Sequence, residues 1–194
     1  MRFLVLTLLF LVNLLYSKIA ISQENIDIYK CINDEDIDCI SEYLMSGFEV
    51  DDQDGDGNTL LIIASGLGKE KVVTYLIDQG AYVDKHNYDG VSSLHKAAQA
   101  GKTSVVDILL DAGAFINNLD IEGRSPLMYA VGANNRFTVE QLVKRGAYIG
   151  LRNIHGEDAK QIAVRLRHYD IVKFFDNEAI KLVPKKAHKY SWEE

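Results

Sequence analysis

The chain has 194 residues, of which 47% are hydrophobic and 25% are charged, with only two prolines and two cysteines. These proportions exclude an intrinsically disordered chain, a collagen-like chain and a disulfide-dense miniprotein, and the length suits a single domain. The formal net charge is −7. Nucleic-acid binders usually carry a basic excess that neutralises phosphates, so we expect no nucleic-acid partner.

The first 22 residues have the plan of a secretory signal peptide. Arg2 precedes an apolar run from Phe3 to Tyr16, which is shorter than the roughly 20 residues that cross a bilayer as a helix. Ala20 and Ser22 are small residues at the positions that a signal peptidase reads. We therefore expect cleavage after Ser22 and no membrane attachment afterwards. The alternative is an uncleaved N-terminal anchor.

Charge is distributed unevenly along the rest of the chain. Residues 31–68 contain ten acidic residues and no Lys or Arg, whereas residues 136–194 contain twelve Lys or Arg and eight acidic residues. One end of the protein is therefore acidic and the other is mildly basic.

A period of 33 residues organises most of the chain, as five columns of similar residues show. Chance does not align five columns over four copies, so each copy is one structural unit. The columns are Gly57, Gly90, Gly123 and Gly156; Gly47, Gly80, Gly113 and Gly146; Ala64, Ala97, Ala130 and Ala163; Val72, Val105, Thr138 and Ile171; and Leu76, Leu109, Leu142 and Phe175.

Each unit predicts a turn followed by two helices. Turn dipeptides such as Asp89-Gly90 open the unit, because glycine adopts a positive φ at little cost. One unit cannot bury both helix faces alone, so we expect the units to stack as a solenoid. The residues placed to cap the first helices are Thr59, Ser92, Ser125 and Asp158, and the glycines placed to end the second helices are Gly80, Gly113 and Gly146.

The units resemble ankyrin repeats, whose pattern runs D-G-x-T-P-L-H-x-A-A and later G-A-x-V-N. The matching stretches are residues 56–64, 89–98, 114–117 and 122–130, and the resemblance covers about residues 25–177. Pro126 is the only copy of the family's proline, and the last repeat is degenerate, which fits a capping unit. The resemblance implies an all-α solenoid of about five stacked helix-turn-helix units linked by β-hairpin turns.

This register divides the chain into six parts after a signal peptide at residues 1–22. The expected parts are an N-terminal cap (23–56), three repeats (57–89, 90–122 and 123–155), a C-terminal capping repeat (156–177) and a polar, loosely ordered tail (178–194).

The two cysteines fall in paired columns of the first unit. Cys31 lies in the alanine column and Cys39 in the valine column, and these columns face each other across the two helices of an ankyrin-like unit. The resemblance therefore implies a Cys31–Cys39 disulfide, which would persist in an oxidising compartment. Two small buried thiols are the alternative.

The resemblance also implies that a partner protein is bound by the hairpin tips and the concave, exposed face of the first helices. Tyr and Arg often anchor such interfaces; the alternative is that these side chains pack on neighbouring hairpins. Tyr82, Phe115 and Tyr148 form an aromatic ladder that either stacks or makes a further strip for a partner. The partner-binding positions carried over by register are Asp56, Asn58, Leu67, Tyr88, Asp89, Val91, Gln99, Ile121, Glu122, Arg124, Ile154, His155, Glu157, Arg165 and Leu166.

No residue pattern indicates an enzyme, a cofactor or a metal. Residues 52–57 resemble the start of a calcium loop, but the position for its bidentate glutamate is Ile63, so we interpret them as an acidic hairpin tip. His95 occupies the histidine position of the family's motif, which implies a structural hydrogen bond. We find no nucleophile elbow, zinc motif or phosphate loop, and we expect a non-enzymatic chain.

The sequence thus favours an exported, monomeric protein-binding module in the periplasm or outside the cell. The role implied by exported bacterial ankyrin proteins is that of an inhibitor, immunity protein or chaperone for a periplasmic or secreted enzyme. A secreted effector that binds host proteins is the first alternative. Self-association, with the acidic end of one copy on the basic end of the next, is another.

Overall fold

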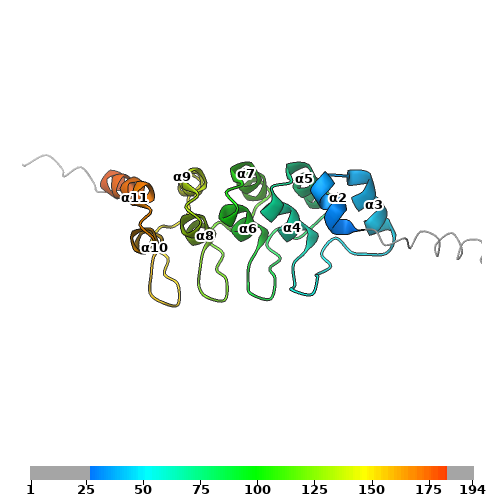
Figure 1. Cartoon of the computed structure of the whole chain (residues 1–194), viewed down its shortest axis with the longest axis horizontal. Coiled ribbons are helices and arrows are strands. Elements are labelled where there is room, and N and C mark those ends of the chain that lie inside the picture. Colours follow the sequence, from blue (N-terminus) through cyan, green and yellow to red (C-terminus); the bar gives the residue numbers. More distant parts are fainter. Residues whose placement is uncertain (1–26, 183–194) are drawn as a thin grey trace, which may run out of the picture.

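The computed structural model describes residues 27–182 as a row of helix pairs joined by hairpin loops (Figure 1). The only strand-like pairing within this part of the chain is an isolated bridge between His86 and Ser92, so the predicted all-α solenoid is confirmed. The signal peptide and residues 183–194 lie outside the described residues. The helices are α2 (Ile28–Asp34), α3 (Ile37–Met45), α4 (Leu60–Leu67), α5 (Glu70–Asp78), α6 (Ser93–Gln99), α7 (Thr103–Asp111), α8 (Pro126–Gly132), α9 (Arg136–Lys144), α10 (Ala159–Arg165) and α11 (Tyr169–Leu182).

The helices form two layers, and the hairpin loops project beyond one of them (Figure 1). The outer layer consists of α5, α7, α9 and α11, and the inner layer, next to the hairpins, consists of α4, α6, α8 and α10. The inner helices pack in succession, α4 on α6, α6 on α8 and α8 on α10. None of the helices between residues 27 and 182 combines the length and apolar character that a membrane span requires.

The repeated columns form the core between the two layers. The alanine column is fully buried from Ala64 to Ala163, and so is the leucine column from Leu76 to Leu142, with Phe175 at 2% exposure. A small residue on the inner helix faces a larger one on the outer helix, which fills the layer without voids. The 33-residue period therefore places each apolar residue inside, as the sequence predicts.

The predicted helix ends are also confirmed. The side chains of Thr59, Ser125 and Asp158 accept hydrogen bonds from the backbone N–H groups three residues later, which satisfies donors that the first turn leaves free. Gly80, which follows α5, has a φ of +88° and ends the helix in the left-handed region.

The turn within each helix pair needs one left-handed residue, and only some units provide glycine there. Gly68 and Gly101 occupy this position in two successive repeats. The equivalent residues elsewhere are Glu35, Asn134 and Arg167, with φ values of 55°, 58° and 62°. Asparagine tolerates this conformation better than glutamate or arginine does.

A side chain closes each hairpin from within. Asp54 Oδ1 accepts hydrogen bonds from the backbone N–H groups of Asp56 (2.9 Å) and Asn58 (2.8 Å). The same two bonds recur 33, 66 and 99 residues later, where the accepting oxygens belong to Asn87, Asp120 and Asn153. These residues form a column that our sequence analysis missed, although the period alone would have revealed it.

Backbone hydrogen bonds join the hairpin tips into one continuous layer. The N–H of Ile121 donates to the carbonyl of Asp89 (3.1 Å), and the N–H of Ile154 donates to the carbonyl of Glu122 (2.9 Å). A longer bond of 3.4 Å joins Tyr88 to Asp56 in the same way. Each hairpin is therefore held both by its own side chain and by its neighbour.

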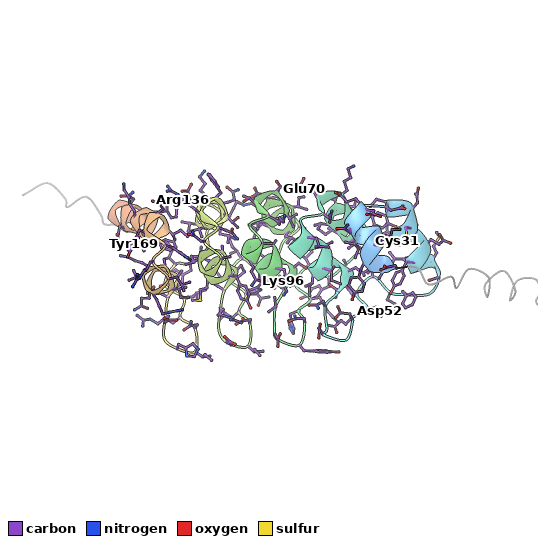
Figure 2. All side chains as sticks on the ribbon, viewed as in Figure 1. Cys31, Asp52, Glu70, Lys96, Arg136 and Tyr169 are labelled. Carbon is purple, nitrogen blue, oxygen red and sulfur yellow. A yellow bond between two sulfur atoms is a disulfide. The ribbon has the colours of Figure 1, made fainter. Side chains whose placement is uncertain are left out.

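A disulfide joins α2 and α3, as the sequence predicts. Cys31 and Cys39 are bonded across the two helices, with their Cα atoms 5.8 Å apart (Figure 2). At the other end of the row, α11 continues to Leu182. The expected boundary of the tail at residue 177 therefore places the end of this helix too early.

Candidate functional site

All but one of the predicted partner-binding residues are exposed or partly exposed. The exception is Val91, which is only 4% exposed and belongs to the buried set. Its N–H donates to Asn87 Oδ1 (2.9 Å) and its carbonyl accepts from the N–H of Asn87. These bonds hold the returning strand of the hairpin so that the side chain of Val91 is buried, and its assignment to the partner surface is wrong.

Seven of the remaining predicted residues line one hollow of about 380 Å³ on the inner-helix face. The hollow lies over α8 and α10 and is bounded by the hairpins that precede these helices. We call it the inner hollow. The seven predicted residues that line it are Gln99, Glu122, Arg124, His155, Glu157, Arg165 and Leu166.

The other predicted residues do not join the inner hollow. Tyr88 and Ile121 line a separate hollow between the second and third hairpins. The predicted residues that lie outside both hollows are Asp56, Asn58, Leu67, Asp89 and Ile154.

A network around a buried carboxylate forms one side of the inner hollow. Asp120 Oδ2 accepts a hydrogen bond from Tyr129 Oη (2.8 Å) and an ion pair from Arg124 Nε (2.8 Å). The guanidinium of Arg124 also lies over the Tyr129 ring, 4.9 Å from its centroid, and reaches Glu122 Oε2 (3.1 Å). The carboxylate of Asp120 is completely buried, so its charge depends on these partners.

The network shifts the pKa values of its members in opposite directions. Burial by itself raises the pKa of Asp120, but hydrogen bonds from Arg124 and Tyr129 outweigh it and hold that pKa below its ordinary value. Burial and the adjacent Asp120 carboxylate raise the pKa of Tyr129. The network therefore keeps a charged carboxylate and a protonated phenol at neutral pH.

A second ion pair forms the opposite side of the inner hollow. Arg165 Nε lies 2.6 Å from Glu157 Oε1, and Arg165 Nη2 lies 3.0 Å from Glu157 Oε2. This two-point pairing fixes the plane of both groups and lowers the pKa of Glu157. Both arginines of the hollow thus already have carboxylate partners within the chain.

Comparison with known families agrees with this repeat geometry. A family model described as ankyrin repeats, three copies, matches residues 28–120, and the single ankyrin-repeat model matches residues 122–154. The chain belongs to the ankyrin-repeat family. A search of curated proteins gave no match to the chain. Ankyrin repeats generally bind other proteins and are typically not enzymes, and this chain carries a protein-interaction module.

Several residues of the inner hollow were not predicted. Met128, Tyr129 and Ile162 contribute its apolar surface, and Gly132 leaves it open. In the ankyrin register Gly132 shares a position with Gln99 and Arg165, both of which we predicted. A comparison of side-chain size along this column would have located the hollow, because the glycine is flanked by two long side chains.

The histidine of the ankyrin motif has the structural role that the resemblance implies. His95 is buried in α6, where its Nδ1 accepts from the N–H of Ser92 (3.2 Å) and its Nε2 lies 3.0 Å from the carbonyl oxygen of Arg124. Burial lowers the pKa of His95, so the neutral ring is favoured. The histidine joins the start of one first helix to the hairpin of the next unit.

The acidic tip of the first ankyrin hairpin is organised by its own backbone. Asp54 is occupied by N–H groups of the loop, as described above, and by Tyr29 Oη (3.1 Å), whereas Asp52 lies at the hairpin end of the row (Figure 2). Within residues 27–182 no cluster of His, Cys, Asp and Glu side chains has the arrangement of a metal site.

Proposed function

We propose that this chain is an exported, non-enzymatic protein that binds one partner protein through the inner hollow. The observation that carries this proposal is the convergence of seven predicted surface residues from three successive units on one hollow. In the role that we favour, the chain is an inhibitor, immunity protein or chaperone of a periplasmic or secreted enzyme. It acts as a monomer.

The chemistry of the inner hollow suits recognition better than catalysis. Its charged groups are paired with each other, as in Glu157–Arg165, so no group is held ready to transfer a proton or to attack a substrate. A fixed polar rim around an apolar floor is instead the composition of a protein interface. Because the ion pairs hold their side chains in place, a partner would lose little conformational entropy on binding there.

Export is supported by two independent features of the sequence. Residues 1–22 have the order of charged, apolar and small residues of a signal peptide. The Cys31–Cys39 disulfide suits an oxidising compartment. A periplasmic location follows from the inhibitor role, whereas a secreted effector would accumulate in the culture medium.

The test of the inner hollow is a substitution that fills it without disturbing the fold. Gly132 is exposed at the end of α8, and a Cβ added there meets no atom within 4 Å. Gly132→Arg introduces the residue that the same repeat position already carries at Arg165. We expect it to reduce the crosslinked capture of the partner from the cell by at least about tenfold, because filling a central pocket removes the anchor of an interface.

The matched control is Gly66→Arg, which makes the same change at the same repeat position outside the inner hollow. A Cβ at Gly66 meets only the Cβ of Lys96, at 3.5 Å, which is ordinary contact. This variant should capture the partner as the wild-type chain does. Undiminished capture by Gly132→Arg would refute binding through the inner hollow.

Localisation is tested separately by mass spectrometry of fractionated cells. We expect the chain in the periplasm with Gln23 as its first residue and with no free thiol before reduction. Accumulation in the medium would favour the effector role, and a chain that keeps residues 1–22 would contradict cleavage.

A further inference from the structure

The aromatic ladder of Tyr82, Phe115 and Tyr148 has a fixed backbone and exposed rings. Each backbone N–H donates to a side chain of the preceding hairpin, from Tyr82 to Asp51 (3.1 Å), from Phe115 to Asp84 (3.0 Å) and from Tyr148 to Asn117 (2.9 Å). The three residues are 58%, 66% and 62% exposed. The ring pairs found between residues 27 and 182 do not include them, so the alternative in which the ladder stacks on itself is not realised.

Two of these rings line the hollow between the second and third hairpins. This hairpin hollow has a volume of about 660 Å³, and Tyr82, Phe115, Tyr88 and Ile121 provide its apolar lining. None of its lining residues belongs to the inner hollow, and none comes from an inner helix. The chain therefore has a second surface of a different composition, in which the rings have no partner.

The spacing of the ladder selects one conformation of a bound chain. Neighbouring units pack through helices whose axes lie about 8–10 Å apart, so equivalent hairpin residues are separated by a similar distance. A polyproline II helix advances about 9 Å per turn of three residues and presents every third side chain on the same face. A β-strand alternates its side chains, so residues three apart point to opposite faces.

The charge around the ladder selects the character of one end of that chain. The first hairpin carries Asp51, Asp52, Asp54 and Asp56, and residues 31–68 contain no Lys or Arg. The fourth hairpin carries one arginine, Arg152, and one carboxylate, Glu157, so the charge declines along the ladder. A basic residue would therefore be attracted to the first hairpin, with apolar residues over the second to the fourth.

We propose that the ladder and the hairpin hollow bind an extended, proline-containing segment of another protein in the polyproline II conformation, with its basic end over the first hairpin. Aromatic grooves recognise such segments because the segment is already extended and loses little entropy on binding. The proposal does not depend on the function of the inner hollow, since the two surfaces share no residue.

The test uses a synthetic peptide of about 12 residues with proline at every third position and two arginines at one end. Its binding to the full mature chain is measured by fluorescence anisotropy. The joint substitution Tyr82→Ser, Phe115→Ser and Tyr148→Ser should weaken binding by at least about tenfold, because buried aromatic anchors carry most of the affinity of such interfaces. The peptide with glycine in place of proline should bind correspondingly more weakly.

Two matched variants locate the peptide. Leu119→Ser changes an apolar hairpin residue that is 43% exposed but lies outside the hairpin hollow, and Gly132→Arg fills the inner hollow; both should bind as the wild-type chain does. Asp52→Asn with Asp56→Asn should weaken binding several-fold at low salt only. No binding of the peptide, equal binding of the glycine peptide, or a loss confined to Gly132→Arg would overturn the proposal.

Discussion

The interior repeats and the terminal units solve the same packing problem with different means. In the interior, α6 packs between α4 and α8, so each face of the helix is covered by a neighbouring unit. At the N-terminal end, α2 and α3 have a neighbour on one side within the described chain, and a disulfide joins the two helices. At the other end, α11 has 14 residues, longer than the other outer helices, and an ion pair joins Asp176 to Lys160 of α10.

This difference indicates how stability is distributed in a row of units. An interior unit gains interfaces with two neighbours, whereas a terminal unit gains one and needs local bonds to replace the other. The helix-pair turns follow the same division: Gly68 and Gly101 hold the left-handed position in the interior, but Glu35 and Arg167 hold it at the ends. The ends therefore combine added bonds with less favourable turns.

The largest expected effect tests whether interior residues stabilise the whole row. Leu109 and Phe175 share a repeat column and are both buried, one in the interior and one at the end. Leu109→Ala should lower the free energy of unfolding of the whole chain by about 3–4 kcal/mol. Phe175→Ala removes a larger side chain, yet its effect should be confined to α10 and α11 because only the last interface is lost.

Hydrogen exchange distinguishes these two outcomes. Faster exchange should reach the helices on both sides of α7 in Leu109→Ala and stay within the last unit in Phe175→Ala. Equal spreading in both variants would mean that the ends and the interior are equally coupled.

Removing the disulfide should have an intermediate effect that stays at the N-terminal end. Replacing Cys31 and Cys39 together by alanine should promote local unfolding of α2 and α3 by about 2–3 kcal/mol, because the open chain regains loop entropy. Amide exchange in these helices should rise as much after reduction of the wild-type protein, which serves as the control. Unchanged exchange in both samples would show that packing alone holds this unit.

The smallest expected effect is a gain of stability at the ends. Glu35→Gly and Arg167→Gly should each raise the free energy of unfolding of the terminal unit by about 0.5–1 kcal/mol, because glycine adopts the left-handed conformation without steric cost. Gly101→Ala is the opposite control: its new Cβ would lie 2.9 Å from the amide of Asn135, which donates to the carbonyl of Gln99. Denaturant titration measures all three, and a loss of stability in either glycine variant would contradict the expectation.

Most of the fold could be predicted from the sequence because the period is read from the residues themselves. The alanine and leucine columns gave the core, and Thr59, Ser125 and Asp158 gave the helix starts, since each role requires a particular residue type at a fixed position. The disulfide followed from the same register. The exposed candidates were predicted by address alone, which explains why Val91 was placed on the surface: a period gives a position but not the direction of a side chain.

The inner hollow could be predicted only in part. The register supplied the residues that line its rim, but the pairings of Arg124 with Asp120 and of Arg165 with Glu157 depend on side-chain directions that no repeat pattern contains. The depth of the hollow depends on the absence of a side chain at Gly132. Sequence comparison along the columns would have found the glycine but not the ion pairs around it.

The backbone bonds between hairpin tips have a consequence for how such a chain changes over generations. The bond from Ile121 to Asp89 and the bond from Ile154 to Glu122 connect residues at the same separation along the chain. If one period of 33 residues were deleted or duplicated in the gene, the tips would meet new neighbours with the same donors and acceptors. Copy number can therefore change in a single recombination event without leaving an unpaired junction, and the length of the binding surface would change with it.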